Sequence, residues 1–209
     1  CMSNLKQMGL AVMMYVQDYD ETYPLTRFPA PAGLPASDYP GGEWGAGWLY
    51  WPQLIYPYDK SIQIAFCPSG VKYTYPTNGQ YGANVNILAD ENKTPLKLAS
   101  VNAPASTYMI MDSGTWRIYA TTTNDVVSPR GSNSYTPGIG DLLHKNCDAS
   151  GTANGVAPDA TACQDFLSGR HLGGLNIIFT DGHVKWLKTG KVYSEASQSD
   201  LGAWNPANS

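Results

Sequence analysis

The chain has 209 residues, of which only 14% are charged, and its net charge is −4. The few lysines and arginines are scattered, so no basic stripe predicts binding to nucleic acid. We find no run of about 18 apolar residues and no signal peptide before Cys1, and we expect the chain as given to be soluble. Low charge together with 14 tyrosines, 6 tryptophans, 21 glycines and 15 prolines is typical of exported proteins with one core.

The first element predicted is an amphipathic helix over residues 3 to 19, with Ser3 as its N-cap and its end at Thr22-Tyr23-Pro24. Its apolar positions recur at helical spacing: Leu5, Met8, Val12, Tyr15, Val16 and Tyr19. We expect this face to pack on a sheet rather than to bind a cofactor. The strands that need such a cover are predicted at residues 107–112, 175–180 and 183–187.

Residues 28–58 are rich in proline, glycine and aromatic side chains, and we expect an irregular segment with one or two helical turns at 51–58. Trp44, Trp48 and Trp51 could form a platform on which a sugar ring stacks. The alternative, which we favour, is that these aromatic residues pin the loop or lie at a subunit contact. Tyr81-Gly82-Ala83-Asn84 and Pro104-Ala105 are expected to be tight connections, and a second polar insertion runs from 121 to 168.

A β-hairpin is predicted near the C-terminus, with arms at 176–180 and 183–187. Asp181-Gly182 between the arms is the pair that suits a two-residue type I′ turn, in which both residues have positive φ. Alternation places Leu175, Ile177 and Phe179 on one face of the first arm, and Val184 and Trp186 on one face of the second.

The four cysteines have none of the C-x-x-C spacings that would predict a zinc site. Cys147 and Cys163 enclose a polar loop, and a disulfide between them would stabilise the fold by roughly 3 kcal/mol. Cys1 and Cys67 then remain, and we favour a bridge between them. Cys1 could instead link neighbouring subunits, or carry a lipid.

No motif of a hydrolase or a metalloprotease accompanies the three histidines, so we expect no enzyme. His171 is expected to donate hydrogen bonds that tie the entry of the hairpin to a neighbouring strand through a buried Asp112. Asp181 is expected to accept backbone N–H bonds in its own turn. The histidines are His144, His171 and His183.

Several of these segments together resemble bacterial type IV pilin-like and type II secretion pseudopilin-like proteins. CMSNLKQ at 1–7, GLA at 9–11 and YVQDYD at 15–20 are similar to the part of the family's first helix that follows its apolar half. His171, nine residues and then Asp181-Gly182 resemble the His-x9-Asp-Gly signature of a large subfamily. Cys67-Pro68-Ser69, Tyr81-Gly82-Ala83-Asn84 and the strand ending at Asp112 follow in the expected order, and only the insertions at 28–50 and 121–168 are not covered.

The resemblance implies an α+β fold with an N-terminal helix packed on an antiparallel sheet, as the order of predicted elements also suggests. It implies one pilin-like domain over 1–209, with variable insertions at about 28–50 and 121–168 and a hairpin at about 175–187. It further implies a structural subunit, with cell adhesion among its roles, that self-associates into a helical homopolymer outside the cell or at its surface, or in the periplasm if the polymer is a pseudopilus.

Two further expectations concern a metal and the N-terminus. Some secretion pseudopilins bind calcium near their C-terminal strands, which makes Asp148, Asp159 and Asp165 candidate ligands and Asp90 with Glu91 a second acidic pair. Family precursors also begin with a leader and about twenty apolar residues that anchor the subunit and form the filament core. This chain starts after that segment, which was removed, is absent from the mature protein, or lies outside the chain given.

If the mature protein lacks the apolar segment, subunits would assemble through surface loops, aromatic residues or strand addition, and the membrane would be contacted only through a segment of the precursor. Two alternatives to a filament subunit stay open at this stage. One is a secreted carbohydrate-binding module that uses Trp44, Trp48 and Trp51. The other is a minor pseudopilin of a secretion system, with the same fold but no long polymer of its own.

Overall fold

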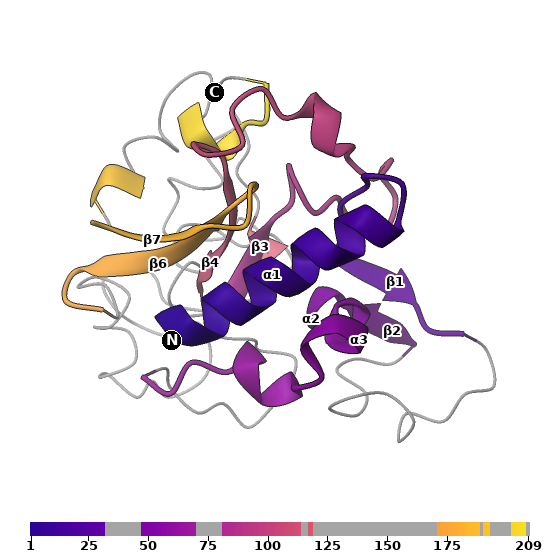
Figure 1. The fold of residues 1–209 in the computed structure, drawn as a ribbon, viewed down its shortest axis with the longest axis horizontal. Coiled ribbons are helices and arrows are strands. Elements are labelled where there is room, and N and C mark those ends of the chain that lie inside the picture. The colour runs from indigo at the N-terminus through magenta and orange to yellow at the C-terminus, as the bar shows by residue number, and fades with distance from the viewer. Residues whose placement is uncertain are drawn as a thin grey trace, which may run out of the picture.

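A long helix and a five-stranded sheet form the framework of the protein (Figure 1). The computed structural model describes residues 1–31, 47–69, 81–113, 117–118, 171–188, 190–192 and 202–207. Its α-helices are α1 (Met2–Asp18), α2 (Trp51–Leu54) and α3 (Tyr56–Asp59), and its 3₁₀ turns are η2 (Ile62–Ala65), η3 (Leu98–Ser100) and η5 (Gly202–Trp204). Its strands are β1 (Arg27–Pro29), β2 (Trp48–Tyr50), β3 (Tyr81–Asn84), β4 (Tyr108–Asp112), β5 (Arg117–Ile118), β6 (Gly174–Phe179) and β7 (Val184–Lys188). The fold is α+β.

The large sheet has the strand order β5-β3-β4-β6-β7. Neighbouring strands are antiparallel except for β3 and β5, which are parallel. The expectation that residues 81–84 are a tight connection is wrong, because they form the buried strand β3. Glycine and asparagine are poor strand formers, but β3 is paired on both sides, and this tertiary pairing overrides local preference.

Helix α1 begins one residue earlier than predicted, with Cys1 in place of Ser3 at the N-cap, and ends at Asp18. Most of the predicted apolar face is buried, and Gly9 and Ala11 join it; Leu5, Met8, Val12 and Val16 are in the core cluster. Tyr19 differs from the prediction because it is exposed and stacks on Tyr15 with ring centroids 4.1 Å apart. The buried apolar face of the helix therefore ends at Val16, although the apolar pattern of the sequence continues to Tyr19.

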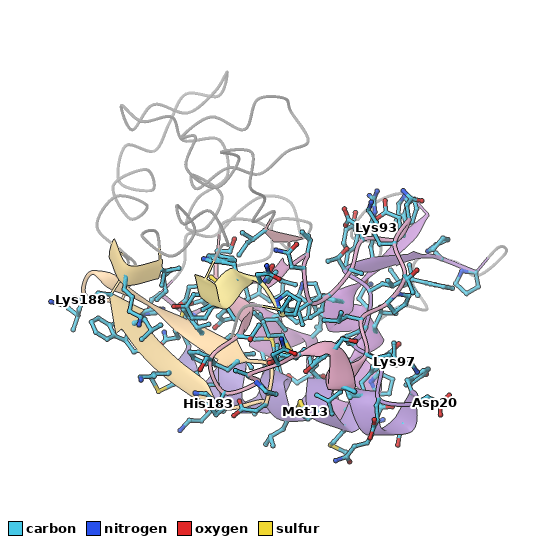
Figure 2. All side chains as sticks on the ribbon, turned by 90° about the horizontal axis from the view of Figure 1, so that it is seen from above. Met13, Asp20, Lys93, Lys97, His183 and Lys188 are labelled. Carbon is cyan, nitrogen blue, oxygen red and sulfur yellow. A yellow bond between two sulfur atoms is a disulfide. The ribbon has the colours of Figure 1, made fainter. Side chains whose placement is uncertain are left out.

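After α1 the chain turns sharply through Asp20 and Glu21, which both have positive φ. Lys97 holds this turn, since its Nζ donates to the Asp20 carbonyl at 2.8 Å, and the two residues lie together in Figure 2. Tyr23 then reaches the far end of the hairpin, where its hydroxyl donates to the buried Thr180 carbonyl at 2.8 Å. Burial raises the pKa of Tyr23 to about 12, so the phenol stays a donor over the physiological range.

The helix crosses the sheet on the face that carries Ile178, with β6 and β7 on one side of it in Figure 1 and β1, β2, α2 and α3 on the other. Strand β6 is buried along its whole length, so its second face, with Leu175, Ile177 and Phe179, is covered as well. On that face Phe179 packs edge-on against Tyr108 at 5.4 Å, and Tyr108 against Trp204 at 5.6 Å. A strand buried on both faces explains why it is apolar at consecutive positions.

Helix α1 and the hairpin touch backbone to backbone at Gly9. A Cβ built on Gly9 would lie 2.7 Å from the carbonyl oxygen of Gly182 and 3.1 Å from Ile178 Cγ2. A backbone oxygen in a hairpin turn cannot move aside as the end of a flexible side chain can. Gly9 is therefore a packing requirement of this helix, although glycine weakens a helix locally.

We expect Gly9→Val to destabilise the protein by about 3 kcal/mol, the upper part of the range for overpacking in a core. Urea unfolding monitored by circular dichroism measures the effect. Gln7→Val is the matched control, because Gln7 is exposed on the same helix and the change there costs only helix propensity, roughly 0.5 kcal/mol. Equal losses in the two variants would show that the close approach at Gly9 is not needed.

The hairpin exists as predicted, but its turn is of another type. Gly182 has φ +89°, whereas Asp181 is not among the described residues with positive φ. The closing pair is Phe179 with His183, whose carbonyl accepts from the Phe179 N–H at 2.9 Å. The loop thus has three residues, Thr180 to Gly182, in the pattern where a turn is followed by a glycine with positive φ. The two-residue type I′ prediction is wrong because Thr180 belongs to the loop.

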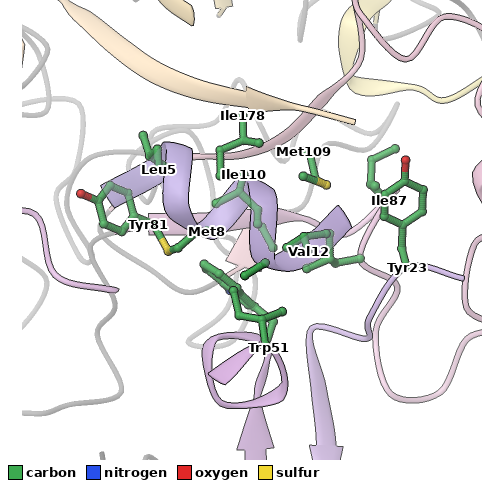
Figure 3. Packing of buried hydrophobic residues seen from close by; sticks show 14 of the residues in the cluster. Leu5, Met8, Val12, Tyr23, Trp51, Tyr81, Ile87, Met109, Ile110 and Ile178 are labelled. Atoms are coloured by element: carbon green, nitrogen blue, oxygen red, sulfur yellow. The ribbon is translucent and has the colours of Figure 1, made fainter. Parts of the chain in front are cut away.

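The predicted irregular segment contains a two-stranded sheet, β1 with β2, followed by the short helices α2 and α3. The expectation of one or two helical turns at 51–58 is confirmed, whereas β1 and β2 were not predicted. Trp51 at the start of α2 is fully buried against α1, in a cluster that includes Met8, Val12 and Ile178 (Figure 3). Among the helices that the structure describes, none combines the length and apolarity needed to span a bilayer.

Candidate functional site

The candidate site lies where the hairpin begins, around His171. Leu172 and Gly173 both have positive φ, at 58° and 79°, so the chain reverses tightly before β6. The His171 N–H donates to the Gly174 carbonyl at 3.3 Å across this reversal. The indole N–H of Trp186, on β7, donates to the His171 carbonyl at 2.8 Å. The backbone of His171 is thus held from both sides.

The imidazole of His171 points to the end of β4, as the sequence led us to expect. Its Nε2 lies 3.3 Å from Oδ2 of Asp112, whose side chain is fully buried. The same oxygen accepts from the backbone N–H of Asn176 at 2.7 Å and from its side-chain Nδ2 at 3.0 Å. Oδ1 of Asp112 is buried and has no hydrogen-bond partner among the residues that the structure describes. The Asp112 carboxylate therefore links the end of β4 to β6 and to the hairpin entry at His171, and it does so through Oδ2 alone.

A disulfide between Cys1 and Cys67 stands beside this pair, which is the pairing that the sequence favoured. Nε2 of His171 is 3.6 Å from Cys67 Sγ. The two sulfurs and one ring nitrogen of His171 all lie within 4.8 Å of one another. Cys1, Cys67, Asp112 and His171 are called the basal cluster below. It joins the start of α1, the segment after η2, the end of β4 and the start of β6.

Removal of the imidazole should weaken the fold. We expect His171→Ala to lower the free energy of unfolding by about 2 kcal/mol, because it removes the neighbour that faces the buried Asp112 carboxylate. His183→Ala is the control, since His183 and its partner Asp181 are well exposed and such a pair contributes about 0.5 kcal/mol. Thermal unfolding of both variants measures the difference. An unchanged melting temperature in His171→Ala would rule out this structural role.

Exposed apolar side chains surround the basal cluster. Met2 follows Cys1, Phe66 precedes Cys67, and Leu172 follows His171; all three are exposed, Leu172 to 99%. Trp186, which contacts the His171 carbonyl, is 36% exposed. A leucine that is fully exposed and also held at positive φ is costly in two ways, since water surrounds it and its backbone region disfavours side chains. Such a residue makes this surface a candidate interaction site.

Asp181 has the local role expected of it. Its Oδ1 accepts from the His183 N–H at 3.1 Å and lies 2.6 Å from His183 Nδ1. The His183 ring stacks on Phe179 at 4.3 Å. His183 lies at the same edge of the molecule as Met13 in Figure 2, where α1 passes the turn. Asp181 and His171, the two ends of the motif, thus stand at opposite ends of β6 and share no site.

The acidic pair Asp90 and Glu91 is used by protein contacts rather than left as two solvated carboxylates. Oδ1 of Asp90 accepts from the Thr26 hydroxyl at 2.7 Å, and Glu91 forms an ion pair with Arg27. Arg27 also lies over the ring of Trp48, 4.1 Å from its centroid. Burial disfavours ionisation of Glu91, but the hydrogen bond and charge of Arg27 outweigh it and lower the pKa of the Glu91 carboxyl.

This shift predicts a pH dependence. A carboxyl with a lowered folded-state pKa contributes stability that is complete above its unfolded pKa, about 4.3, and is lost as pH falls through the folded value. We expect Glu91→Gln to cost about 1 kcal/mol at about pH 7 and less at about pH 3, where the folded carboxyl begins to take up its proton. Urea unfolding at the two pH values tests this. A cost that is the same at both would contradict the ion-pair explanation.

The tryptophan platform is not supported where the structure describes it. Trp51 is fully buried and cannot stack on a sugar, and Trp48 is half-buried with Arg27 on its ring. Trp44 lies outside the described residues. The same holds for the proposed Cys147–Cys163 disulfide and for the calcium candidates, Asp148, Asp159 and Asp165.

Sequence reasoning found His171 and Asp112 but missed the residues that hold them. Asn176 and Trp186 are opposite each other in the β6–β7 register, and each donates to one member of the pair. The alternation of side chains along the two strands could have indicated both residues, because it places Asn176 and Trp186 on the same face of the hairpin as Gly174. A Cβ on Gly174 would lie 2.4 Å from the Trp186 ring, so glycine is needed there.

Comparison of the chain with family models, with curated proteins and with solved structures found no significant match. The family resemblance therefore rests on the motifs quoted from the sequence, and the site must be interpreted from its own geometry.

Proposed function

We propose that this protein is a structural subunit of an extracellular or cell-surface filament of the type IV pilin-like or pseudopilin-like kind, acting by self-association. The observation that carries the proposal is the second apolar face of α1. Leu10 is 65% exposed and Met14 49% exposed, although the opposite side of the same helix is fully packed. These two residues are four apart and therefore neighbours on the helix surface.

Leu10 and Met14, together with Met2, are called the exposed stripe below, and its position supports the proposal. Met2, Leu10 and Met14 lie along one row of α1, at intervals that are multiples of four residues, with the exposed Lys6 between the first two. A helix that packs on its own sheet with one side can use exposed apolar residues on its other side to pack against a neighbouring subunit. A soluble monomer gains nothing from such a row, because exposed apolar side chains that line up favour association.

The resemblance of the sequence to pilin-like proteins points to the same occupant, a second copy of the chain. Two further exposed apolar side chains adjoin members of the basal cluster in the sequence, Met2 after Cys1 and Leu172 after His171. A glycan-binding module is less well supported, because Trp51 of its supposed platform is in the core.

The experiment compares two pairs of charge substitutions on α1. Leu10→Glu/Met14→Glu places two carboxylates on the stripe, and Gln7→Glu/Gln17→Glu places two carboxylates at exposed polar positions of the same helix. Electron microscopy and sedimentation of the secreted protein then measure assembly. We expect the stripe variant to stay monomeric and the control to form filaments, with unfolding free energies within about 0.5 kcal/mol of each other. Filaments of equal length in both variants would refute the role of the stripe.

A further inference from the structure

The basal cluster has a composition that its structural role does not require. Tying α1 to the rest of the fold needs only the Cys1–Cys67 disulfide, and orienting the hairpin entry needs only His171 and Asp112. Nevertheless both sulfurs and a ring nitrogen of His171 lie within 4.8 Å of one another, and the Asp112 carboxylate is 3.3 Å from that ring. Two thiolates and one imidazole are ligand types that Zn²⁺ prefers.

We propose that the reduced form of the basal cluster binds a single divalent metal ion of the zinc type, so that the cluster exchanges a disulfide for a metal according to the redox conditions. Cys1, Cys67 and His171 are the three protein ligands in this proposal, a water molecule takes the fourth position, and the Asp112 carboxylate lies beside the ligand nitrogen of His171. The proposal concerns a site on the single chain and does not depend on filament assembly.

The distances fit such a site. Ligands about 2.3 Å (sulfur) and about 2.0 Å (nitrogen) from a tetrahedral Zn²⁺ stand roughly 3.5 Å apart for a sulfur and a nitrogen. Nε2 of His171 is 3.6 Å from Cys67 Sγ. The two sulfurs must move apart from their bonded distance, and breaking their bond permits that.

The surroundings of Cys1, Asp112 and His171 favour metal binding. Cys1 is the N-cap of α1, where the helix dipole stabilises a thiolate. The Asp112 carboxylate is already buried and held by both nitrogens of Asn176, and its Oδ1 has no hydrogen-bond partner within the described parts of the chain. His171 is held by its own backbone contacts to Gly174 and Trp186. The ligands are thus positioned before a metal arrives.

Exchanging the disulfide for a metal requires two electrons, which a reductant supplies. A trialkylphosphine cleaves the S–S bond by giving two electrons to the sulfurs; it takes an oxygen from water to become a phosphine oxide, and the two protons of that water go to the thiols. A cellular dithiol gives the same two electrons and two protons and becomes a disulfide. When the metal binds, the two thiols release two protons to solvent. The oxidised protein offers no thiolates, and it should bind no metal at this position.

Cobalt(II) is the probe, because sulfur-to-cobalt charge-transfer absorption reports thiolate ligation directly. The full chain is reduced with a phosphine, freed of reductant under anaerobic conditions and titrated with Co²⁺. We expect one ion per chain, with thiolate bands that zinc displaces and that the oxidised protein lacks. Alkylation followed by mass spectrometry should show that metal protects Cys1 and Cys67 but not Cys147 or Cys163.

Variants separate the cluster from other metal-binding groups. We expect His171→Ala to weaken binding by more than tenfold, Asp112→Asn to weaken it by about 10- to 100-fold, and His183→Ala to leave it unchanged. If the reduced chain unfolds, zinc must restore its far-ultraviolet circular dichroism in the wild type and fail to do so in His171→Ala. Absence of binding, absence of that recovery, equal affinity in His171→Ala, or protection of Cys147 and Cys163 instead would each overturn the proposal.

Discussion

Gly182→Val is expected to destabilise the protein by about 4 kcal/mol, for two reasons that act together. Gly182 has φ +89°, a region that costs a side chain roughly 1–2 kcal/mol and a β-branched one more. A Cβ at this position would also lie 2.8 Å from Met13 Cγ on α1, so the new side chain would press the turn away from the helix, at a further cost of about 1–3 kcal/mol. Equilibrium unfolding in urea measures the total.

Gly47→Val separates the two causes. Gly47 has a similar φ, +78°, but a Cβ there would meet nothing within 4 Å. We therefore expect Gly47→Val to show only the backbone cost, about half of the effect at Gly182. If Gly182→Val were no more costly than Gly47→Val, the close contact between the hairpin turn and α1 would contribute nothing to stability.

Loss of the Cys1–Cys67 disulfide is expected to have an effect of similar size. The bond joins residues 66 apart in the sequence, and for a loop of that length the chain-entropy model gives about 4 kcal/mol of stabilisation. We expect Cys1→Ser/Cys67→Ser to lose this amount in chemical unfolding under non-reducing conditions. The bond also fastens the first turn of α1, so fraying should begin at Met2.

Single substitutions supply the control for the disulfide. Cys1→Ser and Cys67→Ser each break the same covalent bond, and each should cost about as much as the double variant. If a single variant were as stable as the wild type, the bridge would not restrain the unfolded chain in the way that its sequence separation implies.

The elements with strong local patterns could be predicted from the sequence. The helix was predicted to within one residue at each end because Leu5, Met8, Val12 and Val16 repeat at its period and are all in the core. Strands β4, β6 and β7 were predicted because short apolar runs stand next to turn residues. The meeting of His171 with Asp112 was expected on chemical grounds, since a buried carboxylate needs a partner.

The features that were missed depend on contacts between distant parts of the chain. Thr180 belongs to the hairpin loop, where its N–H donates to the Thr107 carbonyl and its own carbonyl accepts from Tyr23; no local pattern reveals either contact. Trp51 is in the core because α1 covers it, although its neighbours in the sequence suggest a surface loop. Gly9 looks like a weak point of a helix until its approach to Gly182 is seen.

The convergence of the basal cluster is of the same kind. Cys1 and Cys67 were paired by elimination after Cys147 and Cys163, and nothing in their spacing placed them next to His171. The C-x-x-C rule for zinc excluded a site because it looks only for ligands that are close in the sequence. Cys1, Cys67 and His171 come from three separate parts of the chain and meet only because the sheet and α1 bring them together.

Electron microscopy of the native material from culture fluid, with intact-mass spectrometry on the same sample, tests the central claim most directly. The proposal that the protein is a filament subunit predicts helical polymers of one kind of subunit, in which the row with Leu10 and Met14 on α1 is buried against the next copy. A sample that contains only monomers, or a polymer that leaves this row open to solvent, would contradict it.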